Sequence, residues 1–204
     1  GRFLIMNEQE LCKKRLVDVS KRANRKGIVL FSDFLNLNEL NIYRQSEKLF
    51  ETKTECFGGV PYAERQIIAF IPDALYYEWD YPITALKITP TYPKFAEKLG
   101  HRDILGAIMK LGVDRCKIGD IIVGEDEYYL LCVEGMADYF RENLDKIRHT
   151  IVNLTECSPS EISIHQELEE HDGIITSNRL DAVIACVHKL SRSQALELFR
   201  QEKV

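Results

Sequence analysis

The stretch IGDIIVGEDEYYLLCV, residues 118–133, contains two apolar segments separated by a short acidic turn. Both segments are rich in Ile, Val, Tyr and Leu, residue types that favour a pleated and partly buried strand. The intervening Gly-Glu-Asp-Glu at residues 124–127 provides the turn. The stretch therefore predicts a β-hairpin with strands at residues 118–123 and 128–133.

An amphipathic helix is expected on each side of this hairpin, and a further strand beyond each helix. Residues 101–111 place four apolar side chains on one helical face, namely Ile104, Ala107, Ile108 and Leu111. A second helix is expected at about residues 137–144, and outer strands at about residues 84–89 and 150–156. The order β-α-β-β-α-β is typical of a split βαβ sandwich, so residues 83–157 are predicted to form a ferredoxin-like unit.

Residues 7–82 are predicted to form a separate α+β unit. A basic helix at residues 7–26 and a helix at about residues 38–50 precede two strands, at residues 53–57 and 66–71. The first helix is expected to bury four apolar side chains, namely Leu11, Leu16, Val19 and Ala23.

The first helix carries seven cations against one carboxylate between residues 13 and 26, and Gly27 is its expected end. A charged side opposite an apolar stripe is usually a solvated face, and this interpretation is preferred to RNA binding. The aromatic residues of 73–82 are likewise interpreted as packing anchors rather than as a platform for bases.

The last part of the chain, NRLDAVIACVHKLSRSQALELFRQEKV at residues 178–204, predicts two short amphipathic helices. Ser191 and Gln194 have the spacing of a capping box at the start of the second helix. Helix N-termini and arginines both bind phosphate groups, so these helices are expected to contact an RNA backbone. An acidic hinge at residues 158–173 precedes this unit, which we place at residues 174–204.

Composition and charge exclude several classes of protein. The 204-residue chain has a net charge of −5, and 45% of its residues are apolar. The sequence has no apolar run long enough for a transmembrane helix. Its six cysteines form no C-x-x-C pair, which favours reduced thiols in the cytoplasm. Phosphate-binding loops and zinc-binding helices are not recognisable either, so we expect no catalytic residue, metal, cofactor or small-molecule substrate.

Two motifs carry a resemblance to known families. The R-L-D and S-R-S of residues 179–193 resemble the helical half of the RNA-binding domain named after ribosomal protein S-four, the αL domain, which we expect to be truncated here. The run HRDILGA, followed by LGVDRCKIGD, at residues 101–120 resembles the middle region of the bacterial YlmH family. In that family a charged residue is more usual at the position of Cys116.

The resemblance implies a cytoplasmic, non-enzymatic protein that binds ribosomal RNA on the large ribosomal subunit. Relatives recognise large subunits obstructed by peptidyl-tRNA and assist rescue of stalled nascent chains, so tRNA is a further expected partner. Two alternatives stay open. One is an accessory of RNA modification, because R-L-D also resembles pseudouridine synthases. The other is a protein adaptor in cell division, which the family's gene neighbourhoods suggest.

The expected RNA-binding residues fall into two groups. In the middle unit they are His101, Arg102, Arg115 and Lys117, which could form one patch only if the strand after the helix folds back. A simpler interpretation assigns Arg102 and Asp103 to a salt bridge or helix cap. The terminal group comprises Arg179, Lys189, Ser191, Arg192, Gln194, Arg200 and Lys203.

Overall fold

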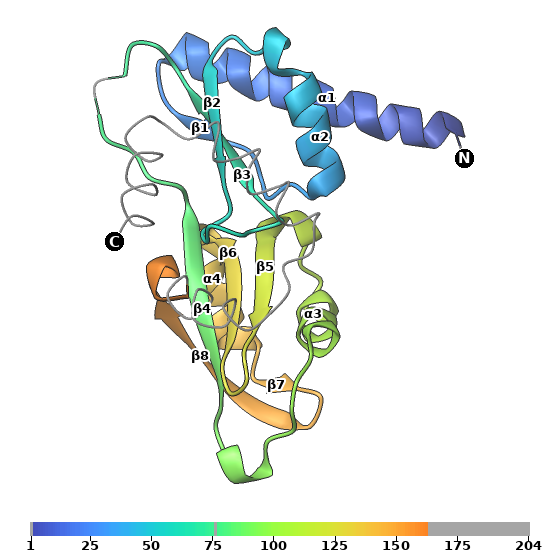
Figure 1. The fold of residues 1–204 in the computed structure, drawn as a ribbon, viewed down its shortest axis with the longest axis vertical. Coiled ribbons are helices and arrows are strands. Elements are labelled where there is room, and N and C mark those ends of the chain that lie inside the picture. The colour runs from blue at the N-terminus through green and yellow to red at the C-terminus, as the bar shows by residue number, and fades with distance from the viewer. Residues whose placement is uncertain (1, 76, 163–204) are drawn as a thin grey trace, which may run out of the picture. The chain divides into compact units, whose positions relative to one another are not determined.

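The computed structural model describes residues 2–75 and 77–162 (Figure 1). These residues form two compact units. The first contains residues up to 57 together with 64–81, and the second contains residues 58–63 together with those from 82 onward. The described residues include no helix with the length and apolar character needed to cross a bilayer.

The first unit is an antiparallel sheet covered by two helices. Its elements are α1 (Arg2–Lys26), β1 (Leu30–Phe31), α2 (Leu37–Gln45), the 3-10 turn η1 (Glu47–Leu49), β2 (Lys53–Phe57) and β3 (Ile67–Ile71). The strand order is β1-β3-β2. The buried core between helices and sheet includes Leu16 and Ala23 of α1, Tyr43 of α2, and Ile68 and Phe70 of β3.

Two details of this unit differ from the sequence prediction. Leu11 was expected to be buried but is 48% exposed, whereas Cys12 packs against the core with Leu16 and Ala23. Within residues 8–26 the inward stripe therefore starts at residue 12, and residue 11 lies about 100° round the helix from it. The second helix ends at Gln45 instead of residue 50, because Ser46 leaves the α-helical conformation, with φ of −100° and ψ of 0°, and the chain continues as the 3-10 turn η1.

The aromatic residues around 77–81 pack within the first unit. Trp79 and Tyr81 lie with ring centroids 5.2 Å apart, and each ring is 5.9 Å from Phe31. The hydroxyl of Tyr77 accepts a hydrogen bond of 2.7 Å from the amide of Val29. Their preferred interpretation as packing anchors agrees with these contacts.

The second unit has the predicted ferredoxin-like topology. Its elements are β4 (Ile83–Pro90), η2 (Pro93–Phe95), α3 (His101–Lys110), η3 (Arg115–Lys117), β5 (Ile118–Val123), β6 (Tyr128–Val133), η4 (Glu134–Met136), α4 (Ala137–Asn143), β7 (Lys146–Ile147) and β8 (Thr150–Cys157). The antiparallel sheet has the order β5-β6-β4-β8-β7. The four strands of the predicted β-α-β-β-α-β pattern lie in the split βαβ order, and the α+β class is confirmed. The two-residue strand β7 was not predicted.

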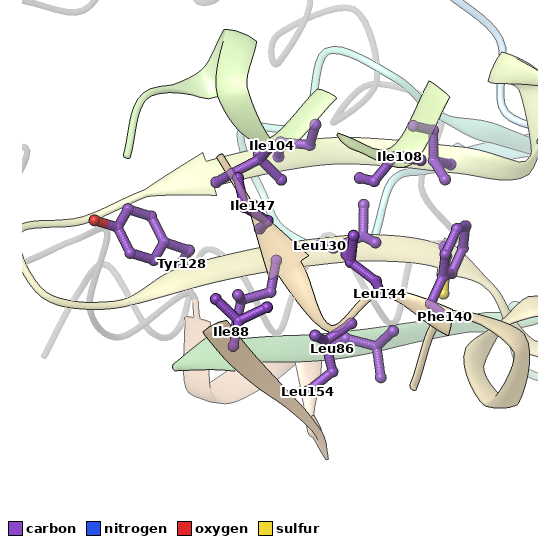
Figure 2. Packing of buried hydrophobic residues seen from close by; sticks show 14 of the residues in the cluster. Leu86, Ile88, Ile104, Ile108, Tyr128, Leu130, Phe140, Leu144, Ile147 and Leu154 are labelled. Carbon is purple, nitrogen blue, oxygen red and sulfur yellow. The ribbon is translucent and has the colours of Figure 1, made fainter. Parts of the chain in front are cut away.

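The helices α3 and α4 cover one face of this sheet, where alternate strand residues point inward (Figure 1). Figure 2 shows Ile104 and Ile108 of α3 over Leu130 of β6, with Phe140 of α4 beside them. All four side chains are fully buried. This packing fixes the position of α3, and therefore of the residues at its ends.

Residues 58–63 pack on the opposite face of the same sheet. Val60 and Ala63 contact a cluster that includes Ala85 and Leu131. Gly59 has a φ of +97°, and a Cβ atom there would lie 3.0 Å from Cδ2 of Leu131. Glycine is therefore required both by the backbone conformation and by the close approach to the sheet.

Candidate nucleic-acid interface

The connection between β4 and α3, residues 91–100, meets the turn between β7 and β8 at one end of the second unit. The amide of Thr91 donates a hydrogen bond of 2.9 Å to the carbonyl of Ile151. The amide of Glu97 donates to Oγ1 of Thr150 at 3.2 Å, and the Glu97 carboxylate accepts from the amide of His149 at 2.9 Å. These bonds fix the turn beside the start of α3.

Two carboxylates position the first residue of that turn. Asp103 accepts a 2.9 Å hydrogen bond from the amide of Gly100, which caps α3. The other oxygen of Asp103 lies 3.8 Å from Nη1 of Arg148, and Oε2 of Glu97 lies 3.9 Å from its Nε. The simpler interpretation of Asp103 as a cap and ion-pair partner is thus supported, although the partner is Arg148. Arg102, which was paired with Asp103 in that interpretation, is exposed.

Arg148 occupies a costly backbone conformation. Its φ of +54° makes it the one non-glycine residue with a positive φ among the described residues. A two-residue hairpin turn needs such a conformation, which glycine adopts freely. For an L-residue with a side chain it costs about 1–2 kcal/mol. The position therefore carries a guanidinium where the backbone alone would favour glycine.

We call this region the α3-end surface and define it as residues 91–103 with Arg148 and His149. Its exposed basic side chains are Lys94, Lys98, His101, Arg102, Arg148 and His149. Glu97 and Asp103 are the two carboxylates within it. The acidic β5–β6 turn lies at the same end of the sheet, because Tyr128, which follows the turn, pairs with Ile88 near the end of β4. This end of the sheet therefore carries both the basic α3-end surface and an acidic turn.

The structure separates the four predicted residues of the middle unit into two pairs. His101 and Arg102 begin α3, a helix of ten residues and about 15 Å in length. Arg115 and Lys117 follow its other end, in η3 at the start of β5. Nη1 of Arg115 donates to the carbonyls of Ile118 and Gly119, at 3.4 and 3.5 Å. The strand does not bring this second pair back to the start of the helix.

The terminal group of predicted residues lies outside the described residues. This group comprises Arg179, Lys189, Ser191, Arg192, Gln194, Arg200 and Lys203. Within the described residues, sequence reasoning missed Arg148 and His149, which join His101 and Arg102. The Lys-Ile and Thr-Ile pairs on either side of Arg148 and His149 are the only local signal of a turn there.

The second unit, a ferredoxin-like fold with exposed basic side chains at one end, resembles one class of RNA-binding domain. The family model described as "Putative RNA-binding domain in YlmH" matches residues 77–161. This match covers all the helices and strands of the second unit.

Two comparisons with whole proteins agree. The chain is 28% identical over 198 residues to "Ribosome-associated protein quality control protein P2" of Bacillus subtilis (strain 168), covering 95% of this chain and 73% of that protein. The solved structure of "Cell division protein ylmH from Streptococcus pneumoniae" is similar, with a TM-score of 0.62 and 22% identity over 76% of this chain and 93% of that one. The family-model match and the Bacillus subtilis relative confirm the resemblance to the YlmH family that the sequence motifs predicted, and the solved structure shows the same fold.

Proposed function

We propose that this protein binds ribosomal RNA through the α3-end surface, with further contacts from the basic residues of 178–204. One observation carries the proposal: Arg148 pairs with Asp103 in the first turn of α3, next to the exposed basic residues His101 and Arg102, within the segment that the RNA-binding family model matches. The contacts are mainly to the phosphate backbone, because RNA duplexes present shape and phosphates more readily than base edges.

Arg148 is suited to binding a phosphate group. Its guanidinium can donate two parallel hydrogen bonds to phosphate oxygens. The ion pairs with Glu97 and Asp103, at 3.9 and 3.8 Å, involve a half-exposed side chain, so each is worth about 0–1 kcal/mol. An RNA phosphate can therefore compete for the guanidinium while the two carboxylates keep it near the first turn of α3.

The proposed setting is the large ribosomal subunit in the cytoplasm, where the protein assists rescue of stalled nascent chains without catalysing a reaction. The name of the Bacillus subtilis relative, which refers to ribosome-associated quality control, supports this setting. Contact with peptidyl-tRNA is part of the proposal. The name of the Streptococcus pneumoniae protein, which refers to cell division, supports a second candidate, an adaptor in that process. A role as accessory to RNA modification is the third.

Co-sedimentation of the full chain with purified large subunits across a salt series tests the proposal. Each phosphate contact that is lost should make the slope of log K against log salt concentration shallower by about 0.7–0.9. We expect Arg102→Glu combined with Arg148→Gly to weaken binding and flatten this slope. Glutamate at the second position of α3 is favourable to the helix, so folding is preserved.

Arg141→Glu provides a matched control. Arg141 is an exposed cation of the same unit, but it lies on α4 and pairs with Asp138 and Glu156. If the α3-end variant binds as tightly as the control, this surface is not the interface. Arg179→Ala with Arg192→Ala tests the terminal segment in the same assay. Complexes that survive nuclease treatment would favour the adaptor, and a changed uridine in treated RNA would favour the modification role.

A further inference from the structure

Among residues 8–75 and 77–162, the most exposed aromatic side chains lie at the tip of the β4–α3 connection. Phe95 is 84% exposed and Tyr92 is 59% exposed, whereas the other exposed large apolar side chains are at most 49% exposed. The two residues flank Pro93 and Lys94, and the 3-10 turn η2 spans Pro93–Phe95. A phenylalanine left in water forgoes about 1.5–3 kcal/mol relative to a buried one. Two such rings within four residues indicate a binding surface.

The tip that carries these rings has a fixed conformation. Pro93 begins the 3-10 turn, and the amides of Phe95 and Ala96 donate to the carbonyls of Tyr92 and Pro93 at 3.0 and 3.3 Å. On the other side, Leu99 is buried and its amide donates to the hydroxyl of Tyr128 at 3.0 Å. Because both ends of the connection are bonded to strands or strand residues, the rings can be presented to a ligand with little loss of conformational freedom on binding.

The charge around the tip affects contacts with phosphates and contacts with bases differently. Lys94 and Lys98 are exposed beside the rings, but the acidic turn of residues 124–127 lies at the same end of the sheet. Attraction to phosphates is therefore partly offset there. Stacking of a base on an aromatic ring does not depend on net charge, and every base offers a face for it. Bases within a duplex are already stacked on one another, so only unpaired bases are available to the tip.

We propose that Tyr92 and Phe95 stack on unpaired bases of an RNA loop or strand, with Lys94 and Lys98 near the adjoining phosphates. This inference rests on the proposed function and adds the class of RNA that the surface recognises. The cations at the start of α3 then hold the neighbouring backbone, while the rings select single-stranded over double-stranded RNA.

Fluorescence anisotropy with the full chain tests the proposal, using a short labelled oligoadenylate and a labelled RNA duplex. Tyr92→Ala combined with Phe95→Ala should lower affinity for oligoadenylate by about tenfold or more, since each stacked base contributes roughly a five- to 150-fold factor. Affinity for the duplex should change less than about threefold. Leu49→Ala is the control, because Leu49 is also a half-exposed apolar residue, in η1.

A second variant reports ring contact directly. Phe95→Trp should keep the affinity, and its fluorescence should be quenched by oligoadenylate, whereas Trp79 of the unchanged chain packs against Phe31 and should respond less. Unchanged oligoadenylate affinity in the double alanine variant would overturn the stacking proposal alone. Equal losses of affinity for oligoadenylate and duplex in this variant would also overturn the proposal. Weaker ribosome binding together with normal oligoadenylate binding would overturn it too, because that result would indicate a contact with a ribosomal protein. If the unchanged chain binds neither RNA, the stacking proposal fails; if it also fails to co-sediment with large ribosomal subunits, the proposed function fails as well.

Discussion

The positive φ of Arg148 leads to a prediction that separates stability from function. We compare Arg148→Gly with Arg148→Ala, which both remove the guanidinium and its ion pairs with Glu97 and Asp103. In the folded state the two variants then differ mainly in how well they tolerate a φ of +54°. Glycine avoids a cost of about 1–2 kcal/mol that alanine retains. Glycine also raises the conformational entropy of the unfolded chain, which destabilises the glycine variant by about 0.4–1 kcal/mol.

The glycine variant should therefore be more stable than the alanine variant by about 0.5–1 kcal/mol. Relative to the unchanged chain, it should lie within about 1 kcal/mol, since two half-exposed ion pairs are lost and the backbone cost is relieved. Urea denaturation of the two variants measures the difference. Thermal denaturation should show a shift of about 1–4 °C. An alanine variant as stable as the glycine variant would refute the reasoning about the backbone.

Binding of RNA should follow a different order in the same variants. Both lack the guanidinium, so both should lose affinity for large ribosomal subunits to the same degree despite their unequal stabilities. A glycine variant that binds normally would show that Arg148 is not an RNA contact. In that case, the costly residue at the turn would need another explanation.

Three further predictions concern the second unit. Ile104→Ala should lower the free energy of unfolding by about 2–5 kcal/mol, because this fully buried side chain lies between α3 and the sheet. A smaller loss in urea denaturation would mean that the core rearranges around the substitution. Asp103→Ala should lower the free energy of unfolding by about 0.5–2 kcal/mol, because the cap on α3 is lost. Asp103→Asn keeps an acceptor for the Gly100 amide and should be less destabilising. Equal losses of stability in the two variants would contradict the capping role. Burial raises the pKa of the Cys132 thiol from 9.0 to about 12, so the unfolded chain releases this proton first and stability should fall between pH 9 and pH 12. Cys132→Ala should make that fall shallower, and an identical pH dependence in both proteins would exclude the thiol as a cause.

The elements that the sequence predicted well are those with a clear local period. In the hairpin of residues 118–133, apolar residues alternate or follow one another over lengths typical of strands. Ile104 and Ile108 repeat at helical spacing. Strand β7 has only two residues, too few for any period to appear. The packing of residues 58–63 on the sheet of the second unit depends on contacts far away in the chain, which no local pattern reveals.

The candidate site was predicted in part for a related reason. His101 and Arg102 were found because a helix start beside basic residues is visible in the sequence. Arg148 is brought to the start of α3 by ion pairs to Glu97 and Asp103, about fifty residues earlier in the chain, and by the hydrogen bond from the amide of His149 to Glu97. Arg115 was grouped with them from closeness in sequence, but the length of α3 separates it from the helix start.

The central position of β4 has a consequence for how the chain emerges during synthesis. β4 pairs on one side with β6, where Ala85 faces Leu131, and on the other with β8, where Ala85 faces Cys157. The second partner is synthesised 72 residues after the first strand, from residue 85 to residue 157, which takes about 4–14 s at about 5–20 residues per second. Throughout that interval one edge of β4 is open to pairing with other chains. A translational pause between residues 133 and 157 would prolong this exposure, leaving a nascent sheet of β5, β6 and β4 to wait for its fourth strand.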